Sequence, residues 1–400
     1  MSELVPKIKF SEFSYKWKHY KLCELSEIRS ASRVHKEQWT ESGVPFFRTS
    51  DVVSAYKGKE NNKAFISIDL FKELSNKAGQ IKKDDLLVTG GGSIGVPYLV
   101  PNDEPLYFKD ADLLWFKNKE IVNGFYLYTF FLTPQFRSHL RRISHTGTIS
   151  HYTIEQAKST PINLPSLIEQ QKIASFLTSV DRKISQLTEK HRLLKEYKKG
   201  VMQQIFSQQL RFKDDDGKAF PEWEESTLVD VAIIIMGSSP KSIAYNDIGE
   251  GLPLIQGNAD IKNRCSAPRI HTSQITKECM YSDILLSVRA PVGSVAKSIH
   301  RACIGRGVAA IRAKKNHHQE FIYQWLLCFE PKWATLSQGS TFDAVNSNEI
   351  KSLFFLVPSF GEQQKIAQFL QSIDKKIDAV MQQVEQTKQF KKGLLQQMFV

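Results

Sequence analysis

The stretch Leu164–Ser207 reads LPSLIEQQKIASFLTSVDRKISQLTEKHRLLKEYKKGVMQQIFS, and Val357–Val400 reads VPSFGEQQKIAQFLQSIDKKIDAVMQQVEQTKQFKKGLLQQMFV. The two stretches align without a gap, and about half of their positions are identical. A constant offset over this length indicates an internal repeat. Pro165 and Pro358 stand at the start of each copy, where a proline can precede a helix but cannot lie within one. We therefore expect each copy to form one long helix.

Apolar residues recur in both copies at steps of four and three. They are Ile173, Leu177, Val180, Ile184 and Leu187 in the first copy and Ile366, Leu370, Ile373, Ile377 and Val380 in the second. A spacing of about 3.5 residues favours a left-handed coiled coil. A single helix cannot bury such a seam alone, and the chain between the copies returns close to its start. Antiparallel pairing of the two copies is therefore expected, because it has the lowest cost of loop closure.

The repeat continues outside the helices. The paired segments are Trp17–Leu22 with Trp223–Leu228, Val44–Asp51 with Leu252–Asp260, Asp84–Val88 with Ser282–Leu286, and His145–Ile149 with Ser337–Thr341. The offset between partners shrinks along the chain, as it would for one fold with loops of different length. The chain is thus expected to alternate globule and helix with a pseudo-two-fold repeat, in the four parts 1–163, 164–207, 208–356 and 357–400.

Each globule mixes strand-like and helix-like segments without a regular βαβ alternation, which favours an α/β (α+β-like) fold. Extended chain is expected at Phe65–Phe71, Asp85–Thr89, Asp283–Val288 and Ala309–Arg312, and amphipathic helices at Phe125–Leu132 and Phe321–Leu327. The charged residues Lys213–Lys218 are expected to form a turn that joins the first long helix to the second globule.

The composition is that of an ordinary globular protein of 400 residues, with 41% hydrophobic and 24% charged residues. The five cysteines are scattered and form no C-x-x-C pair. The sequence has no apolar run of membrane-spanning length and no signal-peptide core. We therefore expect a cytoplasmic protein without a membrane partner. The net charge of +12 favours a polyanionic partner such as nucleic acid. The alternative is a generic basic surface or a basic face covered by an acidic partner.

No motif in the sequence announces catalysis. Gly90–Gly95 fits G-x-G-x-x-G, but the next residues, Val96–Pro101, read as extended chain rather than as the helix that a dinucleotide site requires, so a tight turn between strands is expected. Neither a Walker A stretch nor an Asn-Pro-Pro-Tyr or Asp-Pro-Pro-Tyr stretch occurs. His317 and His318 have no further ligands at convincing spacing, so no metal site is expected. The sequence therefore indicates a binding protein.

Basic and amide residues in the two globules are candidate readers of DNA bases. They are Arg48 and Thr49 in the first globule and Lys241, Ser242, Tyr245, Gln256, Asn258 and Arg289 in the second. Arginine matches guanine edges, and asparagine or glutamine matches adenine, because each pair forms two hydrogen bonds in the major groove. The alternative is structural: Arg48 would pair with Asp51, and the amides would cap turns.

These residues resemble the specificity subunit of type I restriction–modification systems. The resemblance rests on the two Pro-Ser-x-x-Glu-Gln-Gln-Lys-Ile-Ala segments that begin at Pro165 and Pro358, and on Ser239–Asn246 with Gly251–Gly257 at the start of the second globule. The first globule departs from the pattern, since it has Ala31–Val34 where Gly-x-x-Pro is expected.

The resemblance implies a subunit without catalytic activity or cofactor of its own. Two target-recognition domains would each read half of a split, asymmetric target in double-stranded DNA, and the helix pair would set their separation. Two modification subunits would carry S-adenosylmethionine and methylate adenine. Restriction subunits, which act as motor-nucleases with ATP and Mg²⁺, would join for cleavage.

Two other hypotheses remain open on the residues alone. One is a structural adaptor whose coiled coil joins other proteins and whose globules bind protein. The other is a free-standing enzyme with an unrecognised site. A steep fall of DNA affinity with rising salt would favour DNA recognition, indifference to DNA would favour the adaptor, and methyl transfer by the single chain would favour the enzyme.

Overall fold

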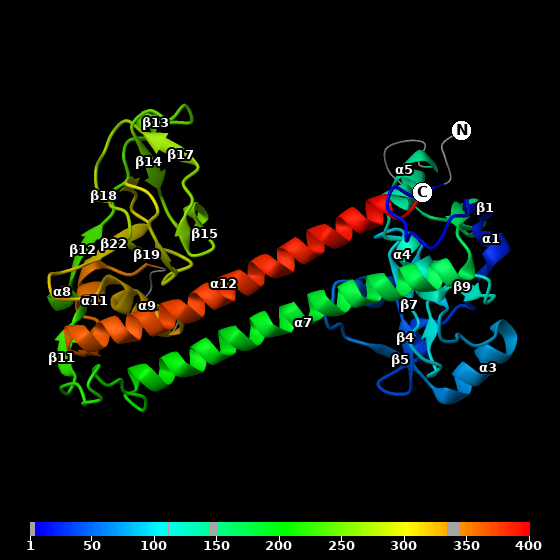
Figure 1. The fold of residues 1–400 in the computed structure, drawn as a ribbon, viewed down its shortest axis with the longest axis horizontal. Coiled ribbons are helices and arrows are strands. Elements are labelled where there is room, and N and C mark those ends of the chain that lie inside the picture. Colours follow the sequence, from blue (N-terminus) through cyan, green and yellow to red (C-terminus); the bar gives the residue numbers. More distant parts are fainter. Residues whose placement is uncertain (1–4, 111, 144–150, 334–343) are drawn as a thin grey trace. The chain divides into compact units, whose positions relative to one another are not determined.

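The computed structural model describes residues 5–110, 112–143, 151–333 and 344–400. The chain folds into two compact units (Figure 1). Unit 1 comprises residues 1–187 and 383–400, and unit 2 comprises residues 188–382. The expected correspondence of His145–Ile149 with Ser337–Thr341 lies outside the described residues.

Both long helices are present, as α7 (Leu167–Phe206) and α12 (Phe360–Gln397). Each begins three residues after the start of its repeated stretch, because a short strand precedes it: β10 (Pro161–Leu164) before α7 and β23 (Phe354–Val357) before α12. Pro165 and Pro358 separate strand from helix, in keeping with the inability of proline to donate to a ladder or to lie inside a helix. Each unit contains a segment of both long helices.

Unit 1 is built on two four-stranded sheets and one strand pair. β1 (Lys18–Lys21) pairs with β10. The first sheet has the order β2 (Ser26–Arg29), β9 (Leu113–Asn118), β6 (Leu86–Thr89), β7 (Pro97–Leu99). The second has the order β3 (Trp39–Thr40), β5 (Ala64–Ile66), β4 (Val44–Phe47), β8 (Tyr107–Phe108). All pairs are antiparallel except β4 with β8.

Short helices connect these strands. They are α1 (Leu22–Leu25), η1 (Lys36–Gln38), α2 (Thr49–Tyr56), α3 (Ile68–Ala78), α4 (Gly124–Phe130), α5 (Pro134–Ile143) and α6 (Ile154–Ser159). The expectation of extended chain over Phe65–Phe71 is wrong beyond Ile66. The hydroxyl of Ser67 accepts a hydrogen bond from the Leu70 amide at 3.2 Å and caps helix α3 at that point.

Unit 2 repeats this architecture with additional strands. β11 (Glu224–Thr227) pairs with β23. One sheet has the order β12 (Ala232–Met236), β22 (Val308–Ala313), β19 (Ile284–Ser287), β20 (Val295–Lys297), β16 (Cys265–Ser266), β15 (Ile261–Lys262). The other has the order β13 (Tyr245–Asn246), β17 (Ile270–Thr272), β14 (Leu252–Ile255), β21 (Ala302–Ile304), β18 (Glu278–Cys279).

The helices of unit 2 also follow the pattern of unit 1. They are α8 (Leu228–Val231), η2 (Ser242–Ala244), η3 (Asn258–Asp260), α9 (Gln319–Phe329), η4 (Glu330–Lys332) and α11 (Ser347–Lys351). Strand order β2-β9-β6-β7 corresponds to β12-β22-β19-β20, and β3-β5-β4-β8 corresponds to β13-β17-β14-β21. Four strands of each sheet in unit 2 therefore follow the strand order of the corresponding sheet in unit 1.

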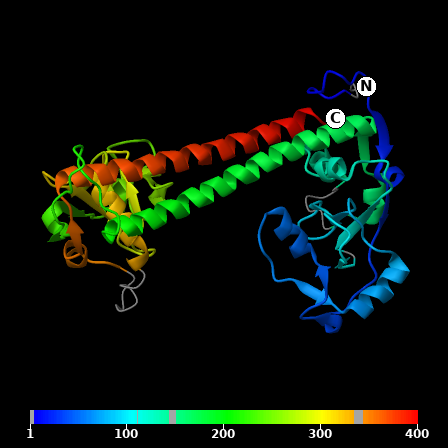
Figure 2. The same ribbon diagram turned by 60° about the horizontal axis from the view of Figure 1, so that its bottom comes forward.

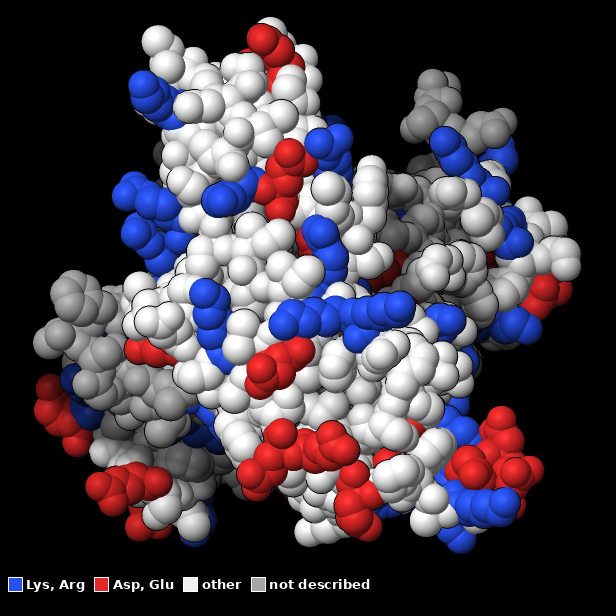
Figure 3. All heavy atoms as spheres, turned by 90° about the vertical axis from the view of Figure 1, so that its left-hand side faces the viewer, with Lys and Arg blue, Asp and Glu red and all other residues white. Residues whose placement is uncertain are grey.

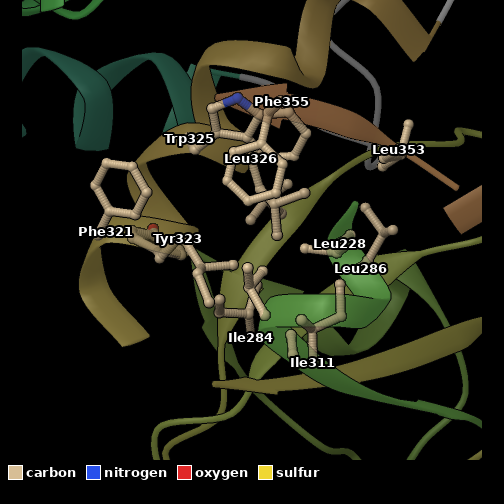
Figure 4. Close-up of a cluster of buried hydrophobic side chains, with 14 of the residues drawn as sticks. Leu228, Ile284, Leu286, Ile311, Phe321, Tyr323, Trp325, Leu326, Leu353 and Phe355 are labelled. Carbon is tan, nitrogen blue, oxygen red and sulfur yellow. The ribbon is translucent and has the colours of Figure 1, made fainter. Parts of the chain in front are cut away.

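The largest core of unit 2 joins its six-stranded sheet to α9 and to both long helices (Figure 4). Figure 4 shows parts of this cluster, among them Ile284, Leu286 and Ile311 of the sheet, Leu228 of α8, Phe321 and Leu326 of α9, and Phe355 of β23. The same cluster contains Val201, Met202 and Ile205 of α7 and Ile366, Ala367, Leu370 and Ile373 of α12. The matching cluster of unit 1 contains Ile173, Leu177 and Val180 of α7 and Leu394, Met398 and Phe399 at the end of the chain. All ten residues of the expected seam are buried except Ile184 and Ile377, which are half-buried.

Two ion pairs join the long helices, one inside each unit. In unit 1, Lys391 Nζ lies 2.6 Å from Asp181 Oδ1, and in unit 2, Lys198 Nζ lies 2.6 Å from Asp374 Oδ1. The second pair repeats the first with the roles of the two copies exchanged. Within each unit the two helix segments run in opposite directions, since the start of one packs beside the end of the other (Figure 2).

Candidate nucleic-acid interface

The repeated Glu-Gln-Gln segment attaches each long helix to its globule. In unit 1 the buried Glu169 accepts a hydrogen bond from Trp17 Nε1 at 3.3 Å. Gln170 donates to the carbonyl of Pro165 at 3.1 Å and accepts from the amide of Asn123, at the start of α4, at 3.0 Å. The motif therefore fixes the start of the helix to the globule.

The same contacts recur in unit 2. Trp223 Nε1 donates to Glu362 at 3.0 Å, and Gln363 donates to the Pro358 carbonyl at 2.8 Å and accepts from the His318 amide at 2.8 Å. Glu362 also binds Arg211, whose Nε lies 2.8 Å from Oε1. Hydrogen bonding to Glu362 raises the pKa of Arg211, whereas burial raises the pKa of Glu169 in unit 1.

A buried aspartate organises the loop after β4 in unit 1. Asp51 accepts from the backbone amide of Arg48 and from its Nε, both at 2.8 Å. The Arg48 guanidinium also donates to the Asn62 carbonyl and lies 5.8 Å from the centre of the Trp39 ring. The structural alternative for Arg48, a pair with Asp51, is thus observed. The adjacent Thr49 hydroxyl is buried and has no hydrogen-bond partner among the described residues.

Asp260 has the same role after β14 in unit 2. It accepts from the Gln256 amide and from Arg269 Nε, each at 2.8 Å. The Gln256 side chain donates to the Tyr245 hydroxyl at 3.0 Å, and this hydroxyl donates to the Pro240 carbonyl at 3.2 Å. The structure thus brings together two of the expected reader residues, Gln256 and Tyr245.

The other expected residues of unit 2 lie on neighbouring loops. Lys241 and Ser242 are exposed before β13, Asn258 is half-exposed at the start of η3, and Arg289 is exposed after β19. The Lys241 backbone amide donates to the Gln274 side chain at 2.9 Å, and the Lys241 side chain is exposed.

These loops meet at one corner of unit 2. We define this corner by Gly237, Gly305, Arg306 and Gly307. The Gly305 amide donates to the Ile255 carbonyl at 2.8 Å, and the Val288 amide donates to the Gly307 carbonyl at 2.9 Å. The ends of β14, β19 and β21 therefore meet here, and Gln256, Arg289 and Arg306 share one region of the surface. Sequence reasoning missed Arg306; its signal is the pair of flanking glycines.

Lysine and arginine side chains gather across the middle of the face shown in Figure 3. A concentration of cations on one face suits a phosphate backbone. Among the described residues, no group of three His, Cys, Asp or Glu side chains could hold a metal ion, and no helix is long and apolar enough to cross a membrane.

The chain is similar to known proteins over most of its length. Residues 15–196 and 221–388 match the family model described as the type I restriction modification DNA specificity domain. A putative type I restriction enzyme MjaX specificity subunit from Methanocaldococcus jannaschii is 35% identical over 248 residues, which cover 60% of this chain and 58% of the relative. A putative specificity subunit from Haemophilus influenzae is 31% identical over 170 residues, which cover 42% and 41%. The aligned regions thus span less than two thirds of both relatives.

A solved structure supports the same fold. That structure is described as the structural basis of complex assembly and conformational transition of the type I R-M system. The chain aligns with it at a TM-score of 0.62 and 24% identity, covering 95% of this chain and 96% of the other.

Proposed function

Since this chain belongs to the family of type I restriction modification DNA specificity domains, we propose that it is the DNA-recognition subunit of a type I restriction–modification complex. The observation that carries the proposal is the family match of both halves of the chain, residues 15–196 and 221–388. The net charge of +12 suits a partner with a phosphate backbone.

Each globule would read one half of a bipartite target in double-stranded DNA. The two globules share their strand order but differ in the residues of the loops after β4 and β14, where Arg48 and Thr49 stand in unit 1 and Gln256 and Asn258 in unit 2. Unlike side chains on like scaffolds predict two half-sites of different sequence. The recognition domains would be residues 1–163 and 208–356.

The helices 164–207 and 357–400 would form an antiparallel coiled coil that sets the gap between the half-sites. The two exchanged ion pairs, Asp181 with Lys391 and Lys198 with Asp374, support pseudo-two-fold pairing, because two copies that pair about a two-fold axis make each contact twice with the roles reversed. Half-sites on one side of a duplex lie about 34–36 Å apart per helical turn.

The chain would act without catalysis or a cofactor of its own. Two modification subunits with S-adenosylmethionine would methylate adenine, and restriction subunits with ATP and Mg²⁺ would cleave. An adenine must leave the duplex to be methylated, so phosphate contacts from this chain would hold the DNA during that step.

The experiment that tests the proposal is the mapping of methylated adenines in cells with and without the gene for this chain. A split, asymmetric motif that disappears on deletion is the expected result. An unchanged methylation pattern, together with no salt-sensitive binding of DNA by the purified chain and its modification partner, would contradict the proposal and favour a structural adaptor.

A further inference from the structure

Arg306 lies in the turn between β21 and β22. Both neighbours, Gly305 and Gly307, are buried, while Arg306 is exposed. A Cβ atom at Gly307 would lie 2.3 Å from the Gln256 carbonyl oxygen, so the turn packs directly against the loop after β14. The Arg306 amide donates to Ser239 Oγ at 3.1 Å. These contacts hold the backbone on both sides of Arg306 in place, and its side chain is exposed.

Arg306 also differs from most arginines of unit 2 in its electrostatic surroundings. The unit has eight arginines, and six of them pair with carboxylates: Arg192, Arg211, Arg264, Arg269, Arg301 and Arg312. Arg289 and Arg306 form no ion pair with the described residues. The hydrogen bond from the Val288 amide to the Gly307 carbonyl brings both of these arginines to the same corner. Their positive charges are therefore available to a ligand from outside the chain.

The matching turn of unit 1 has the opposite charge. It lies between β8 and β9, and its equivalence is marked by hydrogen bonds from the Lys109 amide to the Phe47 carbonyl and from the Gly90 amide to the Asp112 carbonyl, both 2.8 Å. This turn carries Asp110, and Asp112 pairs with Lys109 at 2.6 Å. Both units would meet the same phosphate backbone, so a phosphate anchor is expected in both turns. The two turns differ in charge, and the bases of the two half-sites also differ. The difference in charge therefore favours contact with a base over contact with a phosphate.

We propose that Arg306 is a specificity-determining residue that reads a guanine in the half-site bound by unit 2. The proposal rests on the proposed function. The guanidinium can donate two hydrogen bonds to guanine O6 and N7, which a lysine cannot reproduce with the same geometry. A fixed Cα position favours this role, because two parallel hydrogen bonds demand a defined approach.

The test uses the full chain with its modification subunits, as the wild type and as Arg306→Ala and Arg306→Lys. Arg301→Ala is the matched control, since it also removes an exposed arginine of unit 2, but one that pairs with Glu278 at 2.7 Å. Methylated adenines are mapped in cells for each variant. Affinity is then measured for duplexes that each change one base pair of the target, at several salt concentrations.

We expect Arg306→Ala to weaken binding to the intact target about 10- to 100-fold and to abolish the preference at one G·C pair of one half-site only. Arg306→Lys should lose the same preference with an unchanged salt dependence, and Arg301→Ala should resemble the wild type. Equal weakening on all sequences, with a lower salt dependence, would overturn the proposal in favour of a phosphate contact. Unchanged recognition would overturn it as well. If the wild type itself has no sequence preference, the proposed function fails first.

Discussion

Glu362 and Glu169 offer a matched pair of substitutions that separates a charged contact from an uncharged one. Both carboxylates lie in the first turn of a long helix, both are at most 2% exposed, and both accept a hydrogen bond from a tryptophan indole. Only Glu362 also accepts from Arg211, through Nε at 2.8 Å and Nη2 at 3.0 Å. We therefore compare Glu362→Gln with Glu169→Gln, in which glutamine retains the volume and one acceptor.

Removing one partner of a buried ion pair costs about 3–5 kcal/mol of unfolding free energy. Arg211 is 24% exposed and also donates to the Pro221 carbonyl at 2.6 Å, so part of its hydrogen bonding survives the change. Glu362→Gln should therefore lower the free energy of unfolding by about 2–3 kcal/mol, which is a factor of roughly 30–150 in the equilibrium constant.

The expectation for Glu169→Gln has the opposite sign at neutral pH. Burial raises the pKa of Glu169 above its unfolded value, so the ionised carboxylate reduces stability at any pH above the raised pKa. Replacement by neutral glutamine should leave stability unchanged or increase it by up to about 1 kcal/mol at pH 7. This gain should vanish as the pH falls through the raised pKa, because the wild-type carboxyl then carries a proton.

The assay is urea unfolding of the full chain at several pH values, with hydrogen exchange to follow each unit separately. Equal destabilisation by the two substitutions would refute the reasoning, since it would show that the Arg211 contact adds nothing to the indole hydrogen bond. A loss of more than about 1 kcal/mol for Glu169→Gln at pH 7 would contradict the sign derived from its pKa.

Three further predictions follow from the packing of the long helices and of one turn. Gly293→Ala should lower the free energy of unfolding by about 2–3 kcal/mol, because the φ of Gly293 is +91° and a Cβ atom there would lie 2.3 Å from the Trp333 ring. Gly200→Ala should instead raise the free energy of unfolding by about 0.5–1 kcal/mol, because Gly200 lies within α7 and a Cβ atom there would have no atom within 4 Å. Urea unfolding of both variants tests this. Leu177→Ala and Leu370→Ala replace fully buried side chains, and each should lower the free energy of unfolding by about 2–5 kcal/mol. Hydrogen-exchange protection should be lost only in unit 1 for Leu177→Ala and only in unit 2 for Leu370→Ala, and equal loss in both units would contradict this. Deletion of one heptad from each long helix should change the gap in the methylated motif and leave both half-sites intact, so an unchanged gap would argue against the spacer.

Features encoded locally could be predicted from the sequence. The long helices follow from proline placement and apolar spacing, and their bounds are correct to within three residues at the start. The extended chain after Gly90–Gly95 was expected from Val96–Pro101, and β7 lies there. The prediction of extended chain over Phe65–Phe71 is wrong beyond Ile66, because the hydroxyl of Ser67 caps a helix there. The serine is a local helix signal, but it lies within a mostly apolar run.

The candidate interface depends on contacts between distant segments, which periodicity does not encode. Asp260 orders the Gln256 loop through a bond to Arg269, and nothing in the local sequence distinguishes it from other acids. The repeated Glu-Gln-Gln segment was recognised as a repeat, but its role required Trp17 and Trp223, which lie more than 130 residues away. The flanking glycines mark Arg306 in the sequence, but its lack of an ion pair among the described residues depends on where distant carboxylates lie in the fold.

The segments that lead into the two globules show how the duplicated chain restrains each globule twice. The Ile8 amide donates to the Gln397 carbonyl at 3.0 Å in unit 1, and the Leu210 amide donates to the Gln204 carbonyl at 3.1 Å in unit 2, where Gln204 is the first-copy counterpart of Gln397. Two side-chain contacts repeat in the same way. The ion pair of Lys172 with Glu12 corresponds to that of Lys365 with Asp215, and the ring contact of Phe10 with Phe176 corresponds to that of Phe212 with Phe369. The leading segment of each globule therefore contacts the end of one long helix through its backbone and the start of the other through its side chains. The Glu-Gln-Gln contacts bind that same start to the globule. A globule held by two antiparallel helix segments cannot turn about either one alone, and this restraint is what the proposed spacer of defined length requires.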